Sequence, residues 1–288
     1  MRSLLFVPAD DERKLTKAVS SGADTLIIDL EDSVAPDRKA YARDLISQWI
    51  PNAAPSGPRL FVRINPLTSG HAAADLDAIM PARPNGIMQP KARSAADAVT
   101  LSALISRLEA DIGLAGPETG LIVLITETAA SLQAMTGYDA AGSRLSGLTW
   151  GAEDLSADIG ASTIRNSDGT YRPVYELARA LTLISATAAG VEAIDTVYPD
   201  YRNTEGFTTD CRKAVCDGFT AKMAIHPAQV PIINEIFTPS ADEISRAEAI
   251  VALFSASETG VAALDGQMLD RPHLLKAKRL LARVATAD

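Results

Sequence analysis

The chain has 288 residues, 47% hydrophobic and 22% charged, so it has enough apolar material for a packed core and is not a wholly disordered protein. Its net charge of −9 at pH 7 argues against nucleic acid or an anionic membrane surface as a partner, because both repel an acidic protein. The two cysteines, Cys211 and Cys216, suit neither a disulfide framework nor a zinc site, which indicates a reduced, cytoplasmic protein. No apolar run approaches the length of a membrane span.

Short apolar runs alternate with helical patterns in the first half of the chain. The run SLLFVP is typical of a strand, and Leu15, Ala18 and Val19 follow it at helical spacing. Pro36 suits the first turn of the next helix. The strands predicted in this half cover residues 3–8, 25–32, 59–66 and 86–91, and the helices cover 10–21, 36–50, 72–80 and a segment that begins at 94.

The second half continues the alternation with four more strand-like runs. GLIVLITE and GLTWGAED are each apolar until they end in carboxylates. A polar, turn-rich linker over 161–173 precedes a long alanine-rich helix over 174–190. The strands predicted in this half cover residues 120–127, 147–154, 193–199 and 219–227.

Eight strand-like runs that alternate with helices predict an α/β fold, a closed (β/α)8 barrel over residues 1–238. The chain lacks a Gly-x-Gly-x-x-Gly motif, which would mark the dinucleotide site of an open sheet. Residues 239–288 exceed the eight units, and they contain two helical patterns around a glycine-bearing segment. We therefore expect a C-terminal helical extension that serves as a lid or as a subunit contact.

The carboxyl ends of all the strands in such a barrel face one mouth, where ligands bind. Arg63 lies inside the apolar run LFVRINP and needs an anionic partner, which is either a ligand or a structural ion pair with Glu31 or Asp32. A row of acids around an embedded arginine indicates a functional site rather than solvated surface. The polar residues predicted to share the mouth are Glu31, Asp32, Arg63, Asn65, Lys91, Glu127, Glu153, Asp154, Asp200 and His226.

Glu127 and Asp154 end neighbouring strands and offer hard oxygen ligands. They leave coordination positions to water and substrate, which favours Mg²⁺ over zinc. The alternative is that each carboxylate caps the helix that follows it. A magnesium ion would chelate the hydroxyl or keto oxygen of a substrate while Arg63 stabilises charge that develops on oxygen. That chemistry suits carbon–carbon cleavage next to a carbonyl.

Two lysines and one histidine leave further alternatives open. Lys91 and His226 are candidates for substrate binding, although a His followed by Pro at a strand end is more often a hydrogen-bonded core residue. Lys91 and Lys222 keep a Schiff-base mechanism open, although no lysine occupies an apolar strand interior in the manner usual for that chemistry.

Several motifs, in order, resemble the citrate lyase β-subunit-like proteins of the HpcH/HpaI aldolase superfamily, which also contains malyl-CoA and citramalyl-CoA lyases. The resemblance runs from Arg2 to about Arg283, nearly the whole chain. The motifs that carry it are RSLLFVPAD, DTLIIDLEDSVAPDRKAYAR, FVRINP, QPK, ITETAASL, GAEDLSADIG, AIDTVYPDYRNTEGF, IHPAQV and DGQMLDRP.

The resemblance implies a Mg²⁺-dependent (β/α)8 barrel that makes or breaks the bond between acetyl-CoA and a 2-oxo acid. It implies that Glu127 and Asp154 are metal ligands and that Arg63 is the catalytic arginine. Arg63 and Glu127 would also contact the substrate. Glu31 and Asp32 match the acidic pair that supports the arginine and the metal waters.

The resemblance also implies a homotrimer or a hexamer in which the C-terminal lid of one subunit reaches the mouth of its neighbour. Asp270, in GQMLDRP, matches the acid/base aspartate that this lid delivers. The alternative is that Asp270 caps the final helix.

The reaction stays open among related chemistries. The leading hypothesis is a lyase that cleaves or forms a 3-hydroxyacyl-CoA of the malyl or citramalyl type, with CoA thioesters and 2-oxo acids as its substrates. The alternatives are a (3S)-malyl-CoA thioesterase, a β subunit that acts on a carrier-protein thioester within a citrate lyase complex, and a non-catalytic binding protein. The motif IHPAQV resembles the CoA-thioester enzymes and favours CoA.

Overall fold

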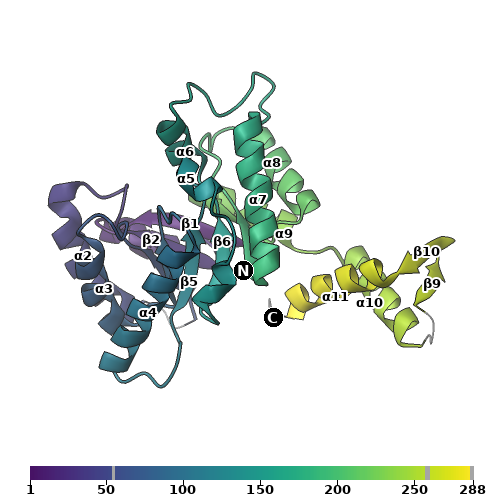
Figure 1. Cartoon of the computed structure of the whole chain (residues 1–288), viewed down its shortest axis with the longest axis horizontal. Coiled ribbons are helices and arrows are strands. Elements are labelled where there is room, and N and C mark those ends of the chain that lie inside the picture. The colour runs from purple at the N-terminus through teal and green to yellow at the C-terminus, as the bar shows by residue number, and fades with distance from the viewer. Residues whose placement is uncertain (54–55, 257–259, 286–288) are drawn as a thin grey trace. The chain divides into compact units, whose positions relative to one another are not determined.

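The computed structural model describes residues 1–53, 56–256 and 260–285. The chain divides into two compact units, Met1–Asn234 and Glu235–Asp288 (Figure 1). Each unit has its own arrangement of helices and strands, and the first one contains the barrel.

The first unit is a closed barrel of eight parallel strands in chain order, and the last strand pairs with the first. The predicted barrel fold is therefore confirmed. Strands covered on both faces read as continuous apolar runs, and all five residues of the second strand are buried. The strands are β1 (Ser3–Pro8), β2 (Thr25–Asp29), β3 (Arg59–Arg63), β4 (Gly86–Gln89), β5 (Gly120–Leu124), β6 (Leu145–Thr149), β7 (Glu192–Asp195) and β8 (Ala221–Ala224).

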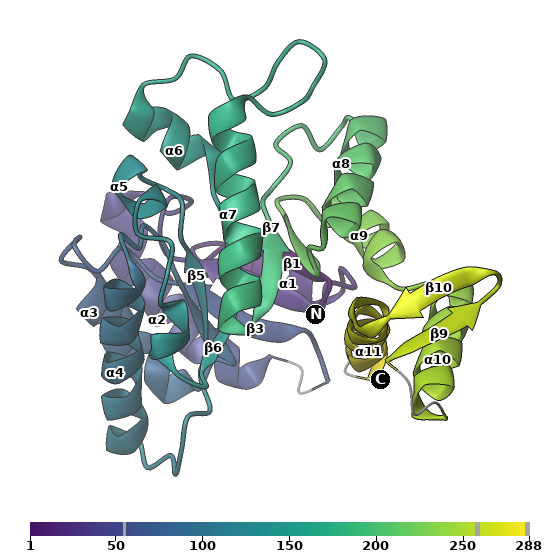
Figure 2. The same cartoon turned by 45° about the vertical axis from the view of Figure 1, so that its right-hand side comes forward.

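Helices surround the strands, as Figure 2 shows for α2, α3, α4 and α7. The expected helix over 174–190 begins at Pro173, whose fixed φ suits a first turn, and ends before Gly190, which has a positive φ of 71°. The helices are α1 (Glu12–Val19), α2 (Lys39–Trp49), α3 (Ala72–Ile79), α4 (Ala95–Asp111), α5 (Ala129–Leu132), α6 (Ala152–Ile159), α7 (Pro173–Ala189), α8 (Thr204–Asp217) and α9 (Val230–Phe237). Short 3-10 turns are η1 (Pro36–Arg38), η2 (Ile50–Asn52), η3 (Met80–Ala82), η4 (Tyr138–Ala141) and η5 (Pro227–Gln229).

Large apolar side chains fill the interior of the barrel. Phe61 has room there because its partner in register on β4 is Gly86, where an added Cβ would lie 2.1 Å from the Phe61 ring. The interior of the barrel is thus a packed core, and in barrels of this type ligands bind at the carboxyl ends of the strands. The interior cluster consists of Leu4, Ile27, Phe61, Met88, Ile122, Leu124, Ile194, Ala221 and Met223.

The second unit contains α10 (Ala241–Ser255), an antiparallel hairpin of β9 (Val261–Leu264) and β10 (Gln267–Asp270), and α11 (Arg271–Ala285). The two expected helices are α10 and α11, and the glycine-bearing segment between them forms this hairpin, for which no strand was predicted. Asp265 and Gly266 form its two-residue turn with positive φ values of 50° and 74°. Asp-Gly between apolar residues is a strong hairpin signal, because this turn type needs positive φ at both positions.

Among the described residues, no helix combines the length and the hydrophobicity needed to cross a membrane. Cys211 is buried, Cys216 is exposed, and both are free thiols. Burial raises the pKa of Cys211 to about 12, so its thiol is protonated and unreactive near neutral pH.

Candidate functional site

A cavity of about 440 Å³, hereafter the mouth cavity, opens at the carboxyl ends of the strands. Five of the ten residues predicted to share the mouth line it, namely Asp32, Arg63, Glu127, Glu153 and Asp154. The other five, Glu31, Asn65, Lys91, Asp200 and His226, are not among the described residues that do so. The full lining is Phe6, Val7, Pro8, Asp29, Asp32, Ser33, Arg63, Leu124, Glu127, Gly151, Ala152, Glu153, Asp154, Thr196, Val197, Met223 and Ile225.

Arg63 is held by a carboxylate that the sequence analysis did not select. Asp29 is its partner in register on β2 and accepts two parallel hydrogen bonds, from Nε and from Nη2, each 2.7 Å long. Glu31 adds an ion pair, with 3.2 Å between Arg63 Nη1 and Glu31 Oε2. The expected structural pair with Glu31 therefore exists, but Asp29 is the main partner. The signal that could have identified this pair is the carboxylate at the end of TLIID, one strand before an embedded arginine.

These contacts fix both the charge and the direction of the guanidinium. Burial opposes ionisation of Arg63, but its hydrogen bonds to Asp29 outweigh that cost and raise its pKa. Burial likewise acts to raise the pKa of Asp29, and the hydrogen bonds and charge of Arg63 hold it below its ordinary value. Arginine has five N–H donors, so the three contacts with Asp29 and Glu31 leave further donors on Arg63, which lines the mouth cavity.

Lys91 links the acids of neighbouring strands. Its ammonium lies 2.6 Å from Glu31 Oε1, 3.4 Å from Asp32 Oδ2 and 3.1 Å from Asp154 Oδ1, and its backbone N–H donates to Glu127 Oε2. Lys91 has a left-handed backbone with φ of 51°, which turns that N–H toward Glu127. Burial raises the pKa of Glu31 despite the charge of Arg63.

Glu127 and Asp154 do not cap helices, so that alternative is wrong. Thr128 caps α5 through its own side chain, and Gly151 at the start of α6 makes no side-chain cap. Gly151 instead lets the chain pass close to Glu127, because an added Cβ would lie 3.2 Å from Glu127 Cγ. Burial, and then the charge of Asp154, raise the pKa of Glu127 to about 8.

The charges around the mouth cavity do not balance. The mouth cluster, defined by these contacts, has five acids, Asp29, Glu31, Asp32, Glu127 and Asp154, against two bases, Arg63 and Lys91. A buried carboxylate such as Glu127, beside a second carboxylate, is stable in its ionised form only if a further cation neutralises it.

The donor set fits a hard divalent ion. In the described part of the chain, no point gathers three or more His, Cys, Asp or Glu side chains into a complete cage. Mg²⁺ commonly binds through one or two carboxylates and takes its other ligands from water and substrate. Glu127 and Asp154 are the residues that would hold it, since both line the mouth cavity and the charge of Asp154 disfavours ionisation of Glu127.

Neither lysine suits a Schiff-base mechanism. Lys222 is fully buried, and its ammonium lies 2.7 Å from Asp195 and 2.8 Å from Asp210. Burial lowers the pKa of Lys222, but the charges of these two acids outweigh it and raise that pKa. The pKa of Lys91 is also raised, by Glu31 against burial. A nucleophilic amine must be neutral, so the charge network argues against this mechanism.

Lys222 belongs to a second ionic group, the neutral cluster, which lies between β7, β8 and the helices outside them. Arg179 contacts Asp195 at 3.3 Å and also pairs with Asp217, and Arg165 lies 3.1 Å from Asp210. Trp150 donates to Asp195 Oδ1 over 2.8 Å. Its three bases, Arg165, Arg179 and Lys222, balance its three acids, Asp195, Asp210 and Asp217.

His226 and Asp270 have local contacts of their own. His226 Nδ1 accepts a hydrogen bond from the Ala228 backbone, and its ring stacks on Tyr201 with centroids 4.3 Å apart. Asp270 ends β10, and its Oδ1 lies 2.6 Å from Nδ1 of His273. His226 as a substrate ligand and Asp270 as an acid/base residue stay predictions.

Comparisons with known proteins agree with this geometry. The family HpcH/HpaI aldolase/citrate lyase matches residues 2–227. A (3S)-malyl-CoA thioesterase of Cereibacter sphaeroides is 33% identical over 288 residues, with 98% of this chain and 94% of the relative covered. The mitochondrial citramalyl-CoA lyase of Rattus norvegicus is 33% identical over 291 residues, with 97% and 85% covered.

A solved structure is similar over the whole chain. The protein CitE from Mycobacterium tuberculosis, in complex with magnesium, acetoacetate and coenzyme A, matches with a TM-score of 0.78 and 34% identity, covering 99% of this chain and 98% of that one. The barrel, its acidic mouth and the matched sequence together show that this chain belongs to the HpcH/HpaI aldolase/citrate lyase family.

Proposed function

We propose that this protein is a Mg²⁺-dependent carbon–carbon lyase that cleaves or forms a 3-hydroxyacyl-CoA of the malyl-CoA or citramalyl-CoA type. The observation that carries the proposal is the excess of carboxylates in the mouth cluster beside an arginine whose direction is fixed by Asp29. CitE with magnesium and coenzyme A, and the lyase among the relatives, support it.

Glu127 and Asp154 hold the metal in this proposal, and the metal supplies Lewis-acid polarisation of a substrate oxygen. Arg63 points its unused N–H donors at the oxygen on which charge develops. The pair with Asp29 keeps the guanidinium in one orientation before substrate arrives, so little reorganisation is needed during the reaction.

Cleavage breaks the bond between C2 and C3 of the hydroxyacyl group. The C3 hydroxyl loses its proton and becomes the carbonyl of the 2-oxo acid, while the electron pair of the broken bond forms the enolate of acetyl-CoA. That enolate takes up a proton at carbon to give acetyl-CoA. Arg63 stabilises the negative oxygen, and an acid/base carboxyl must exchange the proton at carbon.

We assign that carboxyl to Asp270 of a neighbouring copy in a homotrimer or a hexamer. The half-exposed Asp270 side chain contacts His273, and the carboxylate has no described hydrogen bond from the α11 backbone. Co-assembly of Asp270→Asn subunits with Arg63→Ala subunits, each nearly inactive alone, should restore part of the activity. Mixed oligomers that form and stay inactive would contradict the assignment.

The (3S)-malyl-CoA thioesterase relative favours one second candidate, in which the same site holds the same substrate and water attacks the thioester. Product analysis separates the two reactions. Glyoxylate or pyruvate together with acetyl-CoA indicates a lyase, whereas the free hydroxy acid with CoA indicates a thioesterase.

The test is a screen of malyl-CoA, methylmalyl-CoA and citramalyl-CoA with Mg²⁺ and with excess EDTA. We expect turnover that requires the metal and yields a 2-oxo acid. Activity of the isolated chain on CoA thioesters would also count against a citrate lyase subunit that needs a carrier protein. Full turnover in EDTA would overturn the metal assignment.

A further inference from the structure

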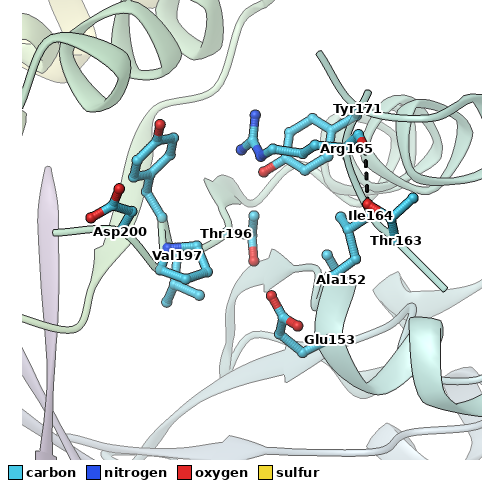
Figure 3. Close-up of a pocket in the computed structure, with 11 residues that line it drawn as sticks. Ala152, Glu153, Thr163, Ile164, Arg165, Tyr171, Thr196, Val197 and Asp200 are labelled. Carbon is cyan, nitrogen blue, oxygen red and sulfur yellow. Dashed lines mark hydrogen bonds between the residues drawn. The ribbon is translucent and has the colours of Figure 1, made fainter. Parts of the chain in front are cut away.

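A second cavity of about 280 Å³, hereafter the side cavity, adjoins the mouth cavity (Figure 3). The two cavities share four lining residues, Ala152, Glu153, Thr196 and Val197. The side cavity extends from this junction between the linker that follows α6 and the segment that follows β7. Its other lining residues are Thr163, Ile164, Arg165, Tyr171, Tyr198, Pro199 and Asp200.

Two polar side chains at the junction lack partners. Thr196 is only 2% exposed, yet its hydroxyl makes no hydrogen bond with any described residue, and it points into the cavity toward Glu153 (Figure 3). Glu153 makes no ion pair within the described ranges, although the Asp154 carboxylate beside it pairs with Lys91. The Thr196 hydroxyl is therefore open to the cavity and free to hydrogen-bond a ligand that enters it.

Thr196 faces this junction because of its place after β7. Successive residues of an extended strand point to opposite sides. Asp195 therefore lies on the outer side of the barrel, where Trp150 and Lys222 contact it, and Thr196 lies on the inner side. The neutral cluster thus anchors the backbone that presents Thr196 to both cavities.

Beyond the junction, the walls of the side cavity are mainly apolar and aromatic. The charged side chains there that make no ion pair among the described residues are negative. Arg165 is already neutralised, because it pairs with Asp210, donates to the Gly169 carbonyl over 2.7 Å, and lies over the Tyr171 ring at 3.7 Å. The Asp200 carboxylate accepts a hydrogen bond from the Arg202 backbone N–H and makes no ion pair in the described part of the chain. A carboxylate ligand in the side cavity would lie near the negative charges of Glu153 and Asp200, and no unpaired basic side chain among the described lining residues would neutralise it.

We infer that the side cavity binds an uncharged substituent of the 2-oxo acid half of the substrate. The inference rests on the proposed function, because it assumes that the keto end of that acid lies at Glu127 and Asp154 in the mouth cavity. A carbon chain longer than the methyl group of pyruvate would pass Thr196 and Glu153 and contact Ile164 and Tyr171. A hydroxyl on that chain would bind Thr196 and Glu153, and a second carboxylate would be repelled.

The test measures condensation of acetyl-CoA with a series of 2-oxo acids in the presence of Mg²⁺. The series is glyoxylate, pyruvate, 2-oxobutanoate, 2-oxopentanoate, 4-hydroxy-2-oxobutanoate and oxaloacetate. We expect kcat/KM for 2-oxobutanoate to equal or exceed that for pyruvate, and kcat/KM for oxaloacetate to be about 100-fold lower. A preference for oxaloacetate would overturn the inference.

Ile164→Trp fills the side cavity without changing the mouth lining. It should lower the ratio of kcat/KM for 2-oxopentanoate to that for glyoxylate by about tenfold or more. Ile184→Trp, at a position on α7 that is 62% exposed, is the matched control and should leave the ratio unchanged. A rise in the KM for acetyl-CoA that is equal for every acid would instead assign the side cavity to the CoA arm and overturn the inference.

Thr196→Val keeps the shape of the side chain and removes the hydroxyl. It should lower kcat/KM for 4-hydroxy-2-oxobutanoate about tenfold more than for 2-oxobutanoate. Thr196→Ser keeps the hydroxyl and should retain the wild-type ratio of these two kcat/KM values. An equal loss for both acids would contradict the role of the hydroxyl. If none of the acids, glyoxylate included, condenses with acetyl-CoA, the proposed function itself has failed. If condensation occurs without an effect of chain length, only the inference about the side cavity is refuted.

Discussion

Two ionic clusters in the described part of the barrel unit differ in their charge balance. The mouth cluster has five acids and two bases, whereas the neutral cluster between β7, β8 and the outer helices has three of each. Both clusters combine carboxylates with arginine and lysine side chains. The mouth cluster lines the mouth cavity through Asp29, Asp32, Arg63, Glu127 and Asp154, whereas Arg165 and Asp210 of the neutral cluster line a different cavity of about 440 Å³.

The difference separates a binding site from a structural one. Buried charges are tolerated when they are paired, as in the neutral cluster. An excess of three negative charges requires a further cation from outside the chain, or a shifted pKa such as that of Glu127. Charge imbalance, rather than the number of acids, therefore identifies the mouth cluster as the candidate metal site.

Removal of one metal ligand should have the largest effect. Glu127→Gln or Asp154→Asn reduces the excess charge and takes away an oxygen ligand, so Mg²⁺-dependent turnover should fall by about 10³-fold or more, since metal stabilisation of developing charge is worth several kcal/mol. Steady-state rates with increasing Mg²⁺ measure the loss. Glu109→Gln, at a buried carboxylate 2.7 Å from Arg144 and outside the mouth lining, is the control. Full activity in either ligand variant would refute the metal assignment.

Disruption of the neutral cluster should affect stability instead. Lys222→Met leaves Asp195 and Asp210 without their shared cation, which should cost about 3–5 kcal/mol of unfolding free energy. Urea denaturation measures this. Arg246→Met breaks an exposed pair with Asp265 and should cost less than about 1 kcal/mol. If the folded Lys222 variant also loses Mg²⁺ affinity in calorimetry, the two clusters are not independent.

Arg63→Lys keeps the charge of the mouth cluster but loses the planar fork that Asp29 holds. We expect kcat to fall by about 10²-fold, the typical loss for one donor to a developing oxyanion, with Mg²⁺ affinity retained. Arg144→Lys, at a buried arginine away from the mouth, controls for stability. A change confined to KM would show that Arg63 only binds substrate.

The dependence of Mg²⁺ binding on pH should be the smallest effect. Because burial and Asp154 raise the pKa of Glu127 to about 8, this carboxyl is protonated in the metal-free fold below that pH, and Mg²⁺ must displace the proton. Mg²⁺ affinity should fall by up to about tenfold per pH unit below 8.

The same shift has a defined sign for stability. An acid whose pKa is raised by folding makes the metal-free protein less stable as pH rises from the ordinary carboxyl range to about 8. Thermal shift by Mg²⁺ should therefore be larger at about pH 8.5 than at about pH 6.5. Glu127→Gln should abolish that dependence, and its persistence in this variant would mean that another group controls it.

Local sequence patterns alone determined the barrel and the strand ends. Continuous apolar runs identify strands that are covered on both faces, and the residues at their carboxyl ends, including Arg63, Glu127 and Asp154, must share one mouth once eight such strands close. The Asp-Gly turn of the β9–β10 hairpin is also visible in the sequence, but no strands were predicted on either side of it.

Pairing between distant residues was decided only by the tertiary structure. Asp29 meets Arg63 because the register of β2 against β3 places them side by side, although 34 positions separate them in the chain. The two acids that pair with Lys222 lie on β7 and α8, and Thr196 lies between the two cavities because it directly follows β7. A local pattern shows that a side chain is polar and lies near a strand end. The partners of that side chain depend on strand register and on helix placement. These partners set the charge balance of the cluster and therefore its chemistry.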